Sequence, residues 1–237
     1  MTGPLWAAGP LPSDHGQLHP NTMNSPDLDL QASHNADDLA DDSGQRDLAR
    51  ALFTAILYGR SQEVLRVAPQ IRSLDSHRDL SFGETPLLFA ARYDLGREAL
   101  EALLARSNPL LTNKEGETAL MLAAWGQQAH SFASVQLLLP LSDPLAANDG
   151  GSTALHVAIY YAQTKIVSLL LPLSDLQQRN SFGRSPLDEA RSLIDYPSDS
   201  YENIANLILG EMARREAAEL ASAAASSPPA HARSPRL

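Results

Sequence analysis

Short apolar segments alternate with turn-forming residues through the middle of the sequence. Within each segment leucine and alanine recur three or four positions apart, which places them on one face of a helix. A glycine stands just before each segment, and glycine tolerates the positive φ angle that a tight turn requires. The pattern therefore predicts short helices separated by turns, in an all-α chain.

The apolar segments are copies of one motif. The first copy reads Gly-Glu-Thr-Pro-Leu-Leu-Phe-Ala-Ala from Gly83, and the second reads Gly-Glu-Thr-Ala-Leu-Met-Leu-Ala-Ala from Gly116. Further copies begin at Gly151 and Gly183, so that successive glycines lie 33, 35 and 32 residues apart. A block reading Leu-Leu-Leu-Pro-Leu-Ser-Asp follows two of the copies. A fixed period of this length is the sequence signature of a repeat architecture.

Each position of the motif has a local structural role. The Thr or Ser after the glycine can cap a helix, and Pro fits the first helical turn, where its missing N–H is not needed. The leucine block predicts a second helix, which the following Pro ends. Asn113, Asn148 and Asn180 stand three residues before a motif glycine, where an Asn side chain can bond its own backbone and hold the turn.

The motif resembles the ankyrin repeat, whose signature is Thr-Pro-Leu-His-x-Ala with a period of about 33 residues. The resemblance covers residues 46–216 and implies an ankyrin-repeat solenoid of about five helix-turn-helix repeats joined by projecting β-turns. The expected repeats are 46–82 as an N-terminal cap, 83–115, 116–150, 151–182, and 183–217 as a C-terminal cap.

The two end repeats are less regular than the central ones. Alignment with the later copies predicts a first helix over Asp47–Tyr58 and a second from Ser61 to Ala68. At the other end, Ser200 can cap a helix that runs from Tyr201 to about Ala221. Terminal repeats need a polar outer face, which both ends provide.

The acidity of the chain is concentrated in its first residues. The formal net charge of the 237 residues is −10, and residues 1–45 hold seven aspartates and no basic residue. We expect this segment to be a disordered acidic arm, with translation starting at Met1 or Met23. Residues 218–237 form an Ala/Ser/Pro-rich tail with a net charge of +1, which leaves −4 for residues 46–217.

Composition excludes several classes of function. An acidic chain does not favour nucleic-acid binding, which draws on clustered Lys and Arg. No apolar run is long enough to span a bilayer, and the absence of cysteine excludes disulfides and thiolate chemistry. No nucleophile, nucleotide or metal motif stands out, so we expect no catalytic residues, cofactor or metal. His156 occupies the signature histidine position, for which the resemblance implies a structural hydrogen bond to turn backbone.

The resemblance implies that a protein partner binds the concave groove, formed by the turn tips and the ends of the first helices. The chain is only 5% aromatic, yet four of its six tyrosines fall at these positions. Tyr, Trp and Arg dominate binding hot spots. The candidate partner-binding residues are Tyr58, Phe82, Arg92, Tyr93, Lys114, Trp125, Asp149, Tyr160, Tyr161, Phe182 and Arg184. The alternative is that these rings only pack between neighbouring repeats.

These observations favour a non-catalytic protein–protein interaction module, expected to be a cytoplasmic monomer. The 16 arginines against two lysines suggest a GC-rich, bacterial genome, in which such a module serves as an exported effector, an immunity protein or a regulator. The alternatives are an enzyme or small-ligand-binding protein with its site in the insertions at 125–134 or 195–199, and a structural spacer.

Overall fold

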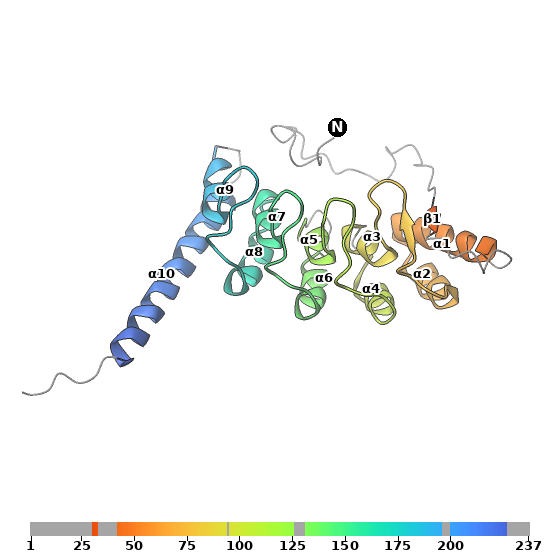
Figure 1. The fold of residues 1–237 in the computed structure, drawn as a ribbon, viewed down its shortest axis with the longest axis horizontal. Coiled ribbons are helices and arrows are strands. Elements are labelled where there is room, and N and C mark those ends of the chain that lie inside the picture. The colour runs from red at the N-terminus through yellow and green to blue at the C-terminus, as the bar shows by residue number, and fades with distance from the viewer. Residues whose placement is uncertain (1–29, 33–41, 94, 126–130, 196–199, 227–237) are drawn as a thin grey trace, which may run out of the picture.

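The computed structural model describes residues 30–32, 42–93, 95–125, 131–195 and 200–226 (Figure 1). Most of these residues are helical, as the sequence pattern predicts, and the helices form pairs. The pairs are α1 (Asp42–Leu57) with α2 (Ser61–Val67), α3 (Pro86–Tyr93) with α4 (Arg97–Leu104), α5 (Ala119–Ala124) with α6 (Ser131–Leu138), α7 (Ala154–Tyr160) with α8 (Thr164–Leu170), and α9 (Pro186–Ser192) with α10 (Ser200–Ser226).

The helix pairs are stacked in chain order (Figure 1). The first helix of each pair contacts the first helix of the next, in the order α1, α3, α5, α7 and α9. The second helices make a parallel row in the order α2, α4, α6, α8 and α10. Each inner pair therefore buries its apolar surface against two neighbours, and each end pair against one.

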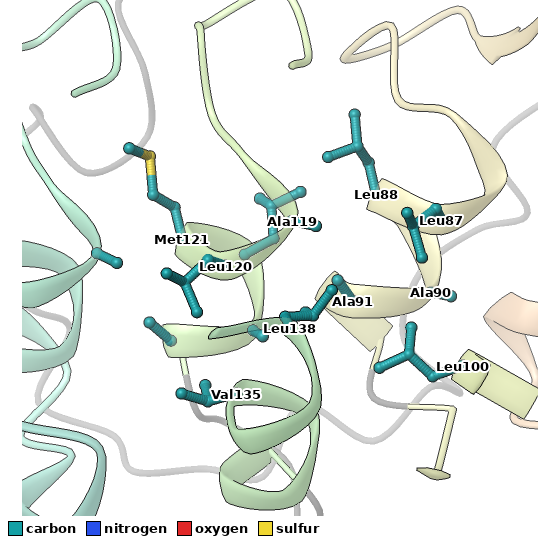
Figure 2. Close-up of a cluster of buried hydrophobic side chains, with 14 of the residues drawn as sticks. Leu87, Leu88, Ala90, Ala91, Leu100, Ala119, Leu120, Met121, Val135 and Leu138 are labelled. Atoms are coloured by element: carbon teal, nitrogen blue, oxygen red, sulfur yellow. The ribbon is translucent and has the colours of Figure 1, made fainter. Parts of the chain in front are cut away.

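The short first helices of the central pairs are buried nearly all round. Every residue of α5 is buried, because α3, α7 and α6 cover it from three sides. Figure 2 shows Leu120 and Leu138 side by side between α5 and α6, with Ala91 of α3 next to them. The small alanine side chains let neighbouring helices approach closely. Leu120 and Leu138 have no exposed surface.

The asparagines of the turns bond their own backbone, which confirms their predicted role. The Oδ1 of Asn113 accepts hydrogen bonds from the N–H groups of Glu115 and Glu117, at 3.1 and 2.8 Å. Asn148 and Asn180 accept the corresponding bonds in the next two turns. Because each asparagine closes its own turn, the three turns share one conformation.

Successive turn tips are linked to one another by backbone hydrogen bonds. The bonds run from the N–H of Lys114 to the carbonyl of Phe82 at 2.9 Å, from Asp149 to Glu115 at 3.0 Å, and from Ser181 to Gly150 at 2.8 Å. One contact thus recurs at the same place in each turn, which keeps the tips in register along the row.

Replacing Gly151 with alanine should cost about 2 kcal/mol of unfolding free energy, and Gly183→Ala about 1 kcal/mol. Both glycines have positive φ angles, +70° and +72°. An added Cβ at Gly151 would lie 3.2 Å from the Cα of Asn180 in the next turn, whereas at Gly183 it would meet no atom within 4 Å. Urea titration of both variants measures the difference. If both variants lost the same unfolding free energy, adjacent turn tips could move apart to accept the added Cβ without further cost.

The ends of the helices follow the sequence signals. The Oγ1 of Thr118 accepts a hydrogen bond from the N–H of Met121 at the start of α5, and Ser185 and Asp188 form a reciprocal capping box at the start of α9. Pro140 and Pro172 convert the ends of α6 and α8 into 3₁₀ turns, η3 (Leu139–Leu141) and η4 (Leu171–Leu173). A similar turn, η2 (Ala68–Gln70), follows α2.

The N-terminal end differs from the prediction. Leu30–Ala32, inside the expected disordered arm, forms strand β1, which pairs antiparallel with β2 (His77–Asp79). Among the described residues, β1 is the only strand that pairs with β2. Helix α1 also begins at Asp42, before the expected boundary at residue 45, because Gln45 bonds the backbone of Gln70 and Arg72. The rest of residues 1–41 lies outside the described residues.

The C-terminal helix is longer than predicted. The expected tail starts at residue 218, but α10 continues to Ser226 and extends beyond the stacked pairs (Figure 1). Alanine has the highest helix propensity, and this segment is rich in it. Arg215 anchors α10 by donating to the carbonyls of Leu171 and Ser174 at 2.6 and 2.9 Å. Within the part of the chain that the structure describes, no helix has the length and apolarity to cross a bilayer.

Candidate partner-binding face

Five of the candidate residues form one continuous stack, which we call the aromatic ladder. The Arg92 guanidinium lies between two rings, with its Cζ 4.8 Å from the Phe82 centroid and 4.9 Å from the Trp125 centroid. The Trp125 ring is 5.4 Å from the ring of Tyr161, which is 5.0 Å from the ring of Tyr160. The ladder joins three successive helix pairs along the side of the turn tips, a surface that we call the tip face.

Arg92 is held in the ladder by two carboxylates. Its Nε donates to Oε1 of Glu84 at 2.7 Å, and its Nη2 lies 2.5 Å from the same oxygen. Nη2 also donates to Oε2 of Glu117 at 3.2 Å. Glu117 accepts a further bond from Nδ2 of Asn113 at 2.9 Å. Arg92 therefore connects two neighbouring turn tips as well as two rings.

Glu84 is an unusual member of this cluster because it is completely buried. Burial raises its pKa from 4.5 to about 7, and the charge of Arg92 keeps the rise from being larger. Its second oxygen, Oε2, is buried and has no hydrogen-bond partner. An unsatisfied carboxylate oxygen costs folding free energy, so the ionised form of Glu84 is disfavoured near neutral pH.

The ladder rings pack on one another and are half-buried rather than fully covered. The rings therefore pack between neighbouring helix pairs and also keep part of their surface accessible. Both the packing role and the binding role that the sequence left open are compatible with this arrangement. Burial raises the pKa of the Tyr161 hydroxyl, with a further contribution from Tyr160. The ladder residues are therefore held in place by their contacts with one another.

Two further aromatic candidates lie outside the ladder. Tyr93 packs toward the core, with its ring 4.5 Å from that of Phe89. Tyr58 is half exposed and lies under the guanidinium of Arg60, at 5.4 Å. The structure does not bring these two rings together with Trp125.

The remaining candidates occupy the turn tips. Lys114 is exposed, and its Nζ donates to the carbonyl of Leu80 at 2.6 Å. Asp149 is exposed on the next tip. On the last tip, the Arg184 guanidinium lies 5.8 Å from the ring of Phe182, which is 53% exposed. These side chains continue the tip face toward both ends of the ladder.

His156 has the structural role that the sequence predicts. Its Nδ1 accepts a hydrogen bond from the N–H of Thr153 at 3.3 Å, and its Nε2 lies 3.3 Å from the carbonyl of Arg184 in the next turn. Burial lowers the pKa of the imidazole. The side chain links two turns and faces no open site.

The described residues contain no group of three His, Asp or Glu side chains placed to hold a metal ion. The predicted insertions at 125–134 and 195–199 fall partly outside the described residues, at 126–130 and 196–199. Sequence reasoning missed Glu84 and Glu117 as partners of Arg92. The available signal was a glutamate after the motif glycine in two successive copies, followed in the first copy by an arginine eight positions later.

Comparison with known families identifies part of the chain. Residues 150–181 match the family model of the ankyrin repeat. This segment is similar to an ankyrin repeat. It comprises the turn at Gly151, helices α7 and α8, and η4. No curated protein matches the sequence.

The ankyrin match falls on the copy that keeps the signature histidine. His156 stands in this copy, whereas the other three copies have Leu88, Met121 and Asp188 at the same position. These copies share with the matched segment the turn glycine and the stacked helix pair. Ankyrin repeats are in general protein–protein interaction modules, so the match supports a function of that kind.

Proposed function

We propose that the protein is a non-catalytic binding module in which five ankyrin repeats form one solenoid. The helix pairs α1/α2 and α9/α10 are its diverged terminal caps, and the three pairs between them are its regular repeats. A protein partner binds the concave groove of this solenoid, at the tip face. The chain acts as a monomer and requires no cofactor.

The observation that supports this proposal best is the aromatic ladder. Half-buried Trp and Tyr rings and the mostly buried Arg92 gather across three successive helix pairs. Binding hot spots are enriched in these residue types and sit in well-packed surroundings. A structural spacer has no need of such a surface, and the described residues offer no catalytic arrangement that would favour an enzyme.

The double variant Trp125→Ala/Tyr160→Ala should lose the partner while keeping the fold. Tagged wild-type protein and variant are used to capture proteins from lysate of the source cell, and quantitative mass spectrometry compares the two sets. The matched control is Leu141→Ala/Leu173→Ala, which trims two exposed leucines on η3 and η4, on the row of second helices. Circular dichroism and thermal unfolding check that each variant is folded.

A partner lost from Trp125→Ala/Tyr160→Ala but kept by the leucine control supports the tip face. A folded but less stable double variant that retains every partner would contradict the proposal and leave the rings with a packing role alone. The finer parts of the proposal are a bacterial source, a cytoplasmic location or export to a host, and a role as effector, immunity protein or regulator. They rest on the arginine bias and on the acidic N-terminal segment.

A further inference from the structure

Two carboxylates at the centre of the tip face have no cation as partner. Glu115 is partly buried and Asp149 is exposed, and neither forms an ion pair with any described residue. Oε2 of Glu115 is buried without a hydrogen bond, and burial raises the pKa of this carboxyl. The N–H of Asp149 donates to the carbonyl of Glu115 at 3.0 Å. The two charges therefore belong to turn tips in direct contact.

The cations closest to this pair are already engaged inside the protein. Arg92 is bound by Glu84 and Glu117, and it is mostly buried. The Nζ of Lys114 bonds a carbonyl of the preceding turn, at Leu80. The centre of the tip face thus carries more negative charge than its own cations offset.

The aromatic ladder belongs to the same tip face, and its own contacts show that a cation binds there between a ring and a carboxylate. The Arg92 guanidinium is 4.9 Å from the Trp125 centroid and 3.2 Å from a Glu117 oxygen. Cations are attracted to ring faces, most strongly to Trp, and to carboxylates. Beyond Trp125 the ladder continues with Tyr161 and Tyr160.

We propose that the partner presents a basic segment to the tip face, with an arginine or lysine side chain that pairs with the carboxylates of Glu115 and Asp149. This inference rests on the proposed function and specifies the chemistry of the partner. An acidic segment would face two unneutralised carboxylates, and like charges across an interface disfavour binding. Residues 46–217 carry a net charge of −4, which favours the approach of a basic partner.

The test begins with the full chain and a random-peptide phage library. Peptides selected on the wild-type protein are sequenced, synthesised and titrated against wild type and variants by fluorescence anisotropy. Glu115→Gln/Asp149→Asn removes the two unpaired charges with little change in shape. The matched control Glu98→Gln/Glu101→Gln removes two exposed charges on α4, in the row of second helices. Trp125→Ala/Tyr160→Ala reports on the tip face itself.

We expect selected peptides rich in Arg or Lys, with affinity about tenfold weaker for Glu115→Gln/Asp149→Asn and unchanged for the control pair. Peptides that depend on Trp125 and Tyr160 but are acidic, or bind the charge variant as tightly as wild type, would overturn the basic-segment inference and leave the proposed function standing. Peptides that bind Trp125→Ala/Tyr160→Ala as tightly as wild type would overturn the proposed function.

Discussion

Replacing Arg92 with alanine should lower the free energy of unfolding by about 3–5 kcal/mol at pH 8. The substitution leaves the carboxylate of Glu84 buried without its cation, and Glu84 has no exposed surface. It also removes the bond to Glu117 and the packing between Phe82 and Trp125. Removing one partner of a buried ion pair is costly because the remaining charge has neither solvent nor counter-ion. Urea-induced unfolding followed by circular dichroism measures the loss.

Arg97→Ala is the matched control for Arg92→Ala. Arg97 forms an ion pair of similar length with Glu101, at 2.7 Å, but its side chain is 63% exposed. An exposed pair of this kind contributes at most about 0.5 kcal/mol. A loss for Arg92→Ala as small as that for Arg97→Ala would contradict the central role of Arg92 in the ladder.

Glu84→Gln should make the protein more stable than wild type at pH 8 but not at pH 4.5. The pKa of Glu84 is about 7 in the folded protein against an ordinary value of 4.5. A carboxyl whose folded pKa is raised contributes stability that is complete below pH 4.5 and is lost as the pH rises through 7. The wild type should therefore lose about 3 kcal/mol relative to Glu84→Gln over this interval.

The measurement is urea unfolding of both proteins at a series of pH values from 4.5 to 8, the interval set by the two pKa values of Glu84. His156 makes an opposing contribution, because its lowered pKa costs stability as the pH falls below 6.5. This contribution is the same in both proteins, so it cancels when the unfolding free energy of the variant is subtracted from that of the wild type. A difference that does not change with pH would show that Glu84 stays ionised throughout.

Features that depend on neighbours in the sequence were predictable. The turn asparagines, the glycines with positive φ and the helix caps each act within a few residues of themselves. Asn113, for example, bonds N–H groups two and four positions ahead. Each of these signals recurs with a period of about 33 residues. The agreement between copies made each local prediction more reliable than a single copy would.

Features that depend on neighbours in space were not predictable. Strand β1 carries no strong signal of its own, and its partner β2 lies more than 40 residues further along the chain. The Glu84–Arg92 pair joins a turn to the far end of α3, and its link to Glu117 crosses into the next helix pair. The sequence placed the ladder residues on one face, but their order of contact depends on how closely the pairs stack.

The link between adjacent pairs has a consequence for how the chain folds. Side-chain hydrogen bonds such as Arg92–Glu117 and Arg215–Leu171 join residues 25 and 44 positions apart, so contact within the stack stays local along the sequence. Low contact order favours rapid folding, because little loop-closure entropy is lost before contacts form. Folding can thus nucleate on any adjacent pair and propagate outward, and the terminal pairs, with one neighbour each, are the first to fray.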